Sequence, residues 1–226
     1  MATASYTSPL AEELAPDVLA RFCRYVRIDT QARRERTSSP STAGQLELGR
    51  LLVDELLDAG VGDAELDANG YTTATLPGSE GADDLVIGLV AHVDTSPDAP
   101  GHGVEPLVHR AYGGGVIELP KDGTRLDPES MPELRGKHGH DLVTSSGDTL
   151  LGADDKAGVA EIMTAIAYLA RHPELPRPTL RICFTPDEEI GEGATLFDIE
   201  RFGALCAYTL DGSELGELQE ETFSAL

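Results

Sequence analysis

The sequence predicts an α/β fold built on a largely parallel sheet. Continuous apolar runs of strand length occur at Leu85 to Ala91, Thr179 to Phe184 and Ala204 to Leu210. Segments whose apolar residues have helical spacing lie between them, as at Lys156 to Arg171. Apolar strands that alternate with helices are typical of parallel sheets whose faces are covered by crossover helices.

The composition is that of a globular protein with an acidic surface. The 226 residues are 40% hydrophobic, and 40 Asp and Glu against 17 Lys and Arg give a net charge of -23. We therefore expect no binding to nucleic acid or to anionic membranes, because phosphate recognition relies on clustered cations. The N-terminus has neither a basic stretch nor an apolar segment, which predicts a cytoplasmic protein without a membrane span.

Two helices and a hairpin are expected before the first buried strand. The first helix is predicted to begin at Pro16, since proline suits a first helical position. Thr42 and Gln45 have the spacing of a capping box at the start of a second helix, which Gly60 would end. Asn69-Gly70 between two strand-like runs indicates a hairpin turn.

The second half of the chain is expected to contain a long decorated loop and two further helices. The loop spans residues 96 to 150 and is predicted to include one hairpin. The helix at Lys156 to Arg171 is stopped by Pro173, and a short helix is expected at Thr195 to Phe202. The three cysteines are expected to be inert thiols, the last two in buried strands: Cys23, Cys183 and Cys206.

Acidic and imidazole side chains follow the ends of the predicted strands. They are His92 and Asp94 after the first strand, Glu188 and Glu189 after the second, Asp211 after the third, and Asp154-Asp155 before the long helix. In open α/β sheets ligands bind beyond the carboxyl ends of the strands, so these groups are expected to face one crevice. A bound cation would keep such a cluster ionised, and its oxygen and nitrogen donors suit zinc, cobalt or manganese.

The roles within this cluster are only partly determined by the sequence pattern. Strand alternation places His92 and Asp94 on the same side, so a carboxylate could orient the imidazole. Glu188 and Glu189 are adjacent and cannot both point inward from a regular strand. One of them is expected to bind metal while the other serves as a general base for hydrolysis.

Four longer motifs resemble a known family, the zinc-dependent aminopeptidases with two co-catalytic metals, and within it the tripeptide aminopeptidases. The motifs are AHVDTSPD at 91 to 98, TLLGADDKAGVAEIM at 149 to 163, FTPDEEIGEGA at 184 to 194 and YTLDG at 208 to 212. The resemblance implies a three-layer αβα sheet of the zinc exopeptidase type. It also implies release of the N-terminal residue from short peptides.

The resemblance also implies a set of metal ligands. His92 and Asp211 would bind one zinc ion, Asp154 would bridge both ions, and Glu189 would bind the second. The peptide bond that follows the bridging aspartate is often cis in this family, so we predict a cis bond between Asp154 and Asp155.

Two further residues receive catalytic roles from the resemblance. Glu188 would be the general base that deprotonates the bridging water. Asp94 would hold His92 in its orientation.

Members of the family are much longer than this sequence, so we expect the fold to be incomplete at the C-terminus. Residues 1–216 would form the N-terminal portion of the catalytic domain, and 217–226 would begin the connection to an absent lid and dimerisation domain. The last histidine ligand of the second zinc site lies in the missing part, so that site is expected to be weak or empty. The histidines outside the motifs are not expected to replace it: His102, His109, His138, His140 and His172.

Alternative functions remain open on the sequence. A related dipeptidase or deacylase shares the metal motifs, and an inactive metal-binding remnant or interaction module would also contain them. A phosphoryl-transfer enzyme is disfavoured because the sequence has no G-x-x-x-x-G-K-[ST] loop. A thermolysin-like site is excluded because there is no H-E-x-x-H motif.

Overall fold

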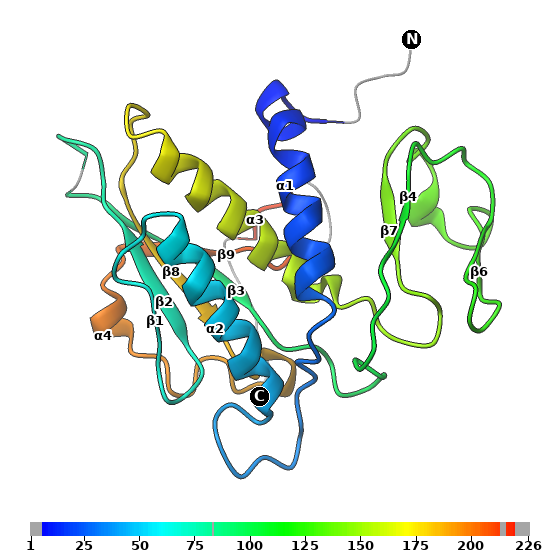
Figure 1. Cartoon of the computed structure of the whole chain (residues 1–226), viewed down its shortest axis with the longest axis horizontal. Helices are drawn as coiled ribbons and strands as arrows, with labels where there is room; N and C mark the ends of the chain where they lie inside the picture. The colour runs from blue at the N-terminus through cyan, green and yellow to red at the C-terminus, as the bar shows by residue number, and fades with distance from the viewer. Residues whose placement is uncertain (1–5, 83, 213–215, 220–226) are drawn as a thin grey trace.

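A single mixed sheet forms the centre of the protein (Figure 1). The computed structural model describes residues 6–82, 84–212 and 216–219. In spatial order the strands are β1 (Glu65–Leu66), β2 (Thr72–Leu76), β8 (Thr179–Thr185), β3 (Val86–His92) and β9 (Cys206–Thr209). The helices around it are α1 (Pro9–Tyr25), α2 (Ala43–Asp58), α3 (Ala153–Arg171) and α4 (Ile199–Phe202).

The sheet is largely parallel, as predicted. β3 pairs in parallel with both β8 and β9, while β2 is antiparallel to its neighbours β1 and β8. Four of these strands therefore run in one direction and only β2 runs against them. The register places His92 opposite Thr185 and Val90 opposite Thr209, so β3, β8 and β9 end at the same edge.

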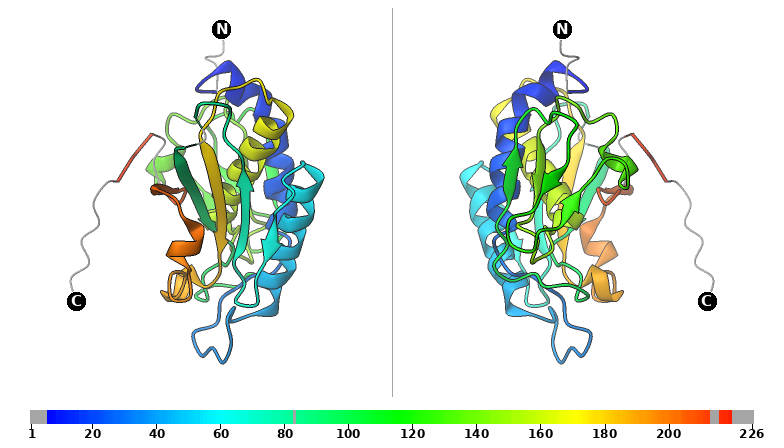
Figure 2. Two further views of the ribbon diagram at one scale, coloured as in Figure 1. Left: turned by 90° about the vertical axis from the view of Figure 1, so that its left-hand side faces the viewer. Right: turned by 90° about the vertical axis from the view of Figure 1, so that its right-hand side faces the viewer.

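The helices are distributed unequally over the two faces of the sheet. Figure 2 shows α1, α2 and α3 on one face, whereas α4 and the segment before it lie on the other. The three-layer arrangement is thus present, but in the described part of the chain its second helical layer consists of α4 alone. None of the described helices combines the length and apolar character needed to cross a membrane.

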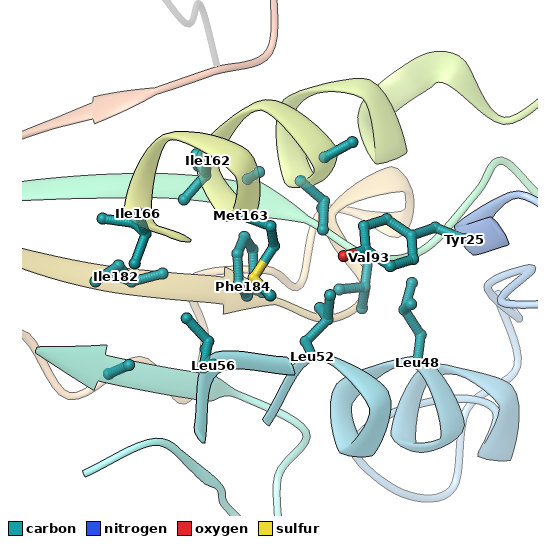
Figure 3. Packing of buried hydrophobic residues seen from close by; sticks show 14 of the residues in the cluster. Tyr25, Leu48, Leu52, Leu56, Val93, Ile162, Met163, Ile166, Ile182 and Phe184 are labelled. Atoms are coloured by element: carbon teal, nitrogen blue, oxygen red, sulfur yellow. The ribbon is translucent and has the colours of Figure 1, made fainter. Parts of the chain in front are cut away.

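The main hydrophobic core lies between the sheet and the three long helices (Figure 3). Leu52 and Leu56 project from α2 toward Phe184 of β8 and Met163 of α3, while Leu48 projects toward Tyr25 of α1. All six side chains are almost fully buried. Close packing of this kind fixes where the strands end, and therefore where the polar groups beyond them lie.

The first helix begins seven residues earlier than predicted. It starts at Pro9, where the Ser8 hydroxyl caps it by accepting the N–H of Ala11 at 3.1 Å. Pro16 lies inside the helix instead of starting it. The prediction was wrong because a serine cap followed by proline is a complete start sequence, and residues 10–15 are good helix formers.

The predicted capping box of the second helix is also absent. α2 begins after Thr42 as expected, but the Thr42 side chain accepts no backbone N–H. Gln45 Oε1, which a capping box would direct to the N–H of Thr42, instead accepts the N–H of Asp187 at 3.1 Å. The Gln45 NH₂ group donates to the Asp187 carboxylate at 2.7 Å and also to the Thr42 hydroxyl at 3.2 Å, so a distant residue holds the side chain that local spacing assigned to the cap.

The hairpin turn and the long loop follow the prediction in part. Gly70 has φ +96°, which glycine adopts without steric cost, and it joins β1 to β2. The segment expected to hold one hairpin contains two small antiparallel pairs. These are β4 (Leu107–His109) with β7 (Leu142–Thr144), and β5 (Ile117–Glu118) with β6 (Arg125–Leu126). They form a lobe, residues 101–148, beside α1 in Figure 1, with its own small core around Tyr112 and Ile117.

The last predicted elements differ most from expectation. α4 covers only Ile199–Phe202, because Asp198 caps it by accepting the N–H of Arg201 and turns precede it. β9 is not buried: all of its residues are exposed, including Cys206, so this cysteine is not a core thiol. The strand lies at the edge of the sheet, where the described residues provide no further neighbour.

The core predicts a contrast within α2. Replacing the fully buried Leu52 by alanine is expected to lower the free energy of unfolding by about 2–5 kcal/mol, because it leaves a cavity against β8 and α3. Leu57→Ala, five residues further on, is the control because its side chain is 45% exposed and should cost little. Urea unfolding followed by circular dichroism measures both; equal losses would contradict the packing described.

Candidate metal centre

The predicted site residues meet at the common exit edge of β3, β8 and β9. One group of ligand atoms from His92, Asp155 and Asp211 lies within 4.8 Å, and so does a second group from His92, Asp154 and Glu189. His92 belongs to both groups. The structure therefore brings together all four residues expected to bind metal, together with Asp155.

The imidazole of His92 is the centre of the cluster. Its side chain is only 2% exposed, and its Nε2 lies 2.8 Å from Asp154 Oδ1. The same nitrogen is 3.9 Å from Glu188 Oε2 and 3.9 Å from Asp211 Oδ2. One buried nitrogen thus faces three carboxylates from three different segments.

Asp94 connects the histidine to the loop after β8. Its carboxylate is fully buried, and Oδ1 lies 3.3 Å from His92 Nδ1. It also accepts the backbone N–H groups of Glu188 at 2.9 Å and Glu189 at 3.1 Å. His92 Nδ1 is also 3.1 Å from the backbone carbonyl oxygen of Asp94, so both groups of this residue lie beside the imidazole. The two backbone contacts with the glutamates were not predicted.

A tight turn directs both glutamates toward the site. Asp187 has a left-handed backbone, with φ +56°, and is followed by the short 3-10 helix η2 (Glu188–Ile190). The chain therefore leaves the strand alternation before Glu188. Two adjacent residues of a regular strand would point to opposite faces, but Glu188 and Glu189 lie in the turn, so both can face the site.

Asp155 is a participant to which the sequence analysis gave no role. The Asp154–Asp155 peptide bond is cis, as predicted. The buried Asp155 carboxylate accepts the N–H of His92 at 3.0 Å and that of Gly158 at 3.2 Å. A β-carbon at Gly158 would meet Leu210 O at 2.2 Å and Asp155 Oδ1 at 2.4 Å, so only glycine allows this approach. A glycine three residues after the Asp-Asp pair was the available clue.

Lys156 is a second residue of the site to which the sequence pattern gives no role. It is almost completely buried under the site and donates from Nζ to the carbonyl oxygen of Ile28 at 2.9 Å. Burial lowers the pKa of Lys156 to about 8, against the charges of Asp29 and Asp94, which raise it. The ammonium group thus links the start of α3 to the segment after α1.

The electrostatics of the cluster favour bound protons. Burial acts to lower the pKa of His92, but the hydrogen bond and charge of Asp94, with the charges of Asp155 and Asp211, raise it to about 10. Burial raises the pKa of Asp155 to about 8, and Asp211 and Asp154 add to this against the charge of His92.

The pKa values of three further carboxyl groups shift in the same direction. Burial and the neighbouring carboxylates raise the pKa of Glu188, Glu189 and Asp211, while the charge of His92 opposes the rise. Mutual repulsion between these groups is the feature that a divalent cation would remove. The donor set of one imidazole nitrogen and several carboxylate oxygens also fits such a cation. The described residues thus contain a possible metal-binding cluster.

Comparison with known proteins shows which proteins this chain resembles. No family model matches the chain. Peptidase T of Bacillus subtilis (strain 168) is 50% identical over 210 residues, which is 92% of this chain and 51% of the relative. Peptidase T of Shouchella clausii (strain KSM-K16) is 50% identical over 209 residues, with the same coverage. The chain is similar to peptidase T over nearly all of its own length. It spans about half the length of the peptidase T relatives it matches.

Solved structures agree with the peptidase T relationship. The aminopeptidase PepT from Bacillus cereus ATCC 10987 aligns with a TM-score of 0.62 and 26% identity, covering 88% of this chain and 44% of that chain. The aminoacylhistidine dipeptidase from Vibrio alginolyticus aligns with a TM-score of 0.56, covering 95% of this chain and 36% of that chain. At 18% identity the dipeptidase supports only the fold. The expected fold class and the resemblance to peptidase T are therefore confirmed.

The raised pKa values predict how metal-free stability depends on pH. Both Asp155 and His92 hold protons more tightly in the folded chain than in the unfolded chain. Their contributions are fully present below the ordinary values of 3.8 and 6.5, and are lost as the pH rises through about 8 and about 10. The urea midpoint of the metal-free protein is thus expected to fall across this range.

The control for this prediction is Asp155→Asn, since the amide imitates the protonated acid. It should flatten the decline between pH 3.8 and about 8. A decline due to His92 should remain but become smaller, because the charge of Asp155 no longer helps to raise the pKa of His92. Identical pH profiles for the variant and the original protein would show that Asp155 is not the titrating group.

Proposed function

We propose that this chain forms the metal-binding part of a metal-dependent aminopeptidase of the peptidase T type, which releases the N-terminal residue of tripeptides. The observation that supports it most is the convergence of His92, Asp154, Glu189 and Asp211 at one sheet edge, in a chain 50% identical to peptidase T. Residues 1–216 would belong to the catalytic domain. Of the proposed connection at 217–226, residues 220–226 lie outside the described part of the chain.

The proposed cofactor is zinc, with two ions in a complete site. His92 and Asp211 would hold one ion, Asp154 would bridge the two, and Glu189 would hold the second. Among the described residues the ligand groups contain no histidine besides His92, which is assigned to the first ion, so the second ion would have only the carboxylates of Asp154 and Glu189. This supports a second site that binds more weakly than the first.

Glu188 is the proposed general base. Its carboxylate is 53% exposed, so it reaches the solvent from which water and peptide arrive, yet its Oε2 lies 3.9 Å from His92 Nε2. The environment that raises its pKa also makes it a better proton acceptor than a free carboxylate. A bound divalent cation would polarise the scissile carbonyl.

The proton balance of the reaction then depends on Glu188. It would accept a proton from the attacking water as the new carbon–oxygen bond forms. It would pass that proton to the departing amine as the peptide carbon–nitrogen bond breaks. Asp94 would keep His92 in place and hold the backbone of Glu188 throughout, through the contacts described above.

The decisive experiment combines metal titration with a conservative substitution. Glu188→Gln is expected to lower zinc- or cobalt-supported tripeptide hydrolysis by about 10²- to 10⁴-fold, because it removes the base and preserves shape. Cobalt binding, followed by the visible absorption of the ion, should persist. Glu174→Gln is the control, since Glu174 is exposed and pairs with His172 away from the cluster.

Two outcomes would overturn the proposal in different ways. Cobalt binding without any turnover that depends on Glu188 would indicate a metal-binding module instead of an enzyme. Failure to bind cobalt at all would exclude the metal centre itself.

A further inference from the structure

A buried hydrogen-bond network lies directly behind the turn that carries Glu188 and Glu189. The Asp187 carboxylate accepts the N–H of Ser41 at 2.7 Å, the hydroxyl of Ser41 at 2.5 Å and the Gln45 side-chain amide at 2.7 Å. In return Gln45 Oε1 accepts the backbone N–H of Asp187 at 3.1 Å. Asp187 and Gln45 are both almost completely buried.

This network fixes a strained backbone position. Asp187 is in the left-handed region at φ +56°, which costs energy for a residue other than glycine and persists only where its surroundings enforce it. The reciprocal bonds with Gln45 hold both the backbone and the side chain of Asp187. They tie the turn after β8 to the first turn of α2, across 142 residues of sequence.

The turn is therefore held from two sides. Asp94 accepts the N–H groups of Glu188 and Glu189 on the side of the site, and the Asp187–Gln45–Ser41 network holds the residue before them on the other. Arg36 adds a tether just beyond, because it donates to Glu192 at 2.6 Å and lies 4.0 Å from Asp187.

We propose that Asp187, Gln45 and Ser41 are positioning residues that direct Glu188 and Glu189 into the metal centre. The inference rests on the proposed function, since it concerns the same two glutamates. It gives a function to the Thr42–Gln45 segment, whose spacing suggests a helix cap. It also explains the buried carboxylate of Asp187, which contacts none of the predicted metal-ligand side chains. None of the three would touch substrate; they act through the backbone of the turn.

The test uses Asp187→Asn, because asparagine tolerates the left-handed region as aspartate does. The substitution thus keeps the backbone conformation accessible but removes the negative charge, and it replaces one oxygen acceptor by an NH₂ donor that faces the Ser41 and Gln45 donors. We expect cobalt affinity to fall about 10- to 100-fold at the weaker of two binding steps, as for other groups that orient metal ligands. Hydrogen exchange of the metal-free protein should become faster in the segment 187–191.

Two additional variants complete the design. Ser41→Ala removes the hydroxyl donor and leaves the Asp187–Gln45 pair, so it should lower cobalt affinity in the same way but by less. If Asp187→Asn does not fold, Ser41→Ala tests the proposal in its place. Asp141→Asn is the matched control, because that carboxylate also fixes a loop, accepting the N–H of Ala111 at 2.9 Å, but in the separate lobe. It should change neither cobalt affinity nor exchange at 187–191.

The outcomes separate this proposal from the proposed function. Normal cobalt binding and unchanged exchange in folded Asp187→Asn, or in folded Ser41→Ala if Asp187→Asn does not fold, would overturn the positioning role and leave the metal centre intact. No cobalt binding by the original protein would overturn both. Where tripeptide turnover is measured, the loss should fall on kcat with KM nearly unchanged, since substrate contacts are not altered.

Discussion

The buried carboxylate of Asp94 is the interaction on which the candidate site depends. It lies beside His92 at the end of β3 and accepts two backbone N–H groups from the turn after β8. A buried charge is stable only when it is well paired, so these contacts cannot be lost singly without cost. Through Asp94, the position of the imidazole and the position of the two glutamates are set by one group.

The sheet explains why the remaining acids meet there. Parallel strands end at the same edge, and β3, β8 and β9 therefore deliver His92, Glu188 and Asp211 to one place. The start of α3 adds Asp154 and Asp155 from beneath. The result is an acidic cluster around one imidazole. The carboxylates of Asp94 and Asp155 accept backbone N–H groups within it, and Gln45 accepts the N–H of Asp187, so these contacts hold the acidic groups together despite their repulsion.

The sequence was most informative where local pattern and sheet geometry agree. The strand-end positions of His92, Glu188 and Asp211 could be predicted because continuous apolar runs locate the strands and parallel order aligns their ends. The long motifs supplied the assignment to the peptidase T relatives. Neither argument needs a contact between distant residues to be known beforehand.

Predictions failed where a distant partner or position in the sheet decides the outcome. Gln45 has the spacing of a capping residue, but Asp187 binds it instead, and no local rule connects the two. An apolar run also looks the same in a central and an edge strand, so the exposure of β9 could not be read from its residues. Asp155 was expected in the cluster but received no role of its own, because an Asp-Asp pair before a helix is ordinarily explained by the helix dipole.

The lobe of residues 101–148 is inserted between two neighbours of the cluster, since His92 and Asp154 touch at 2.8 Å although 62 positions separate them. The entropy of closing a loop grows only logarithmically, by about 0.6 kcal/mol for each doubling of its length. The lobe has its own small core, and among the described residues only Val104 and Val143 join it to the main core. A segment grafted into the lobe away from these two valines should therefore add little loop-closure cost and leave the imidazole and the carboxylate that faces it in place.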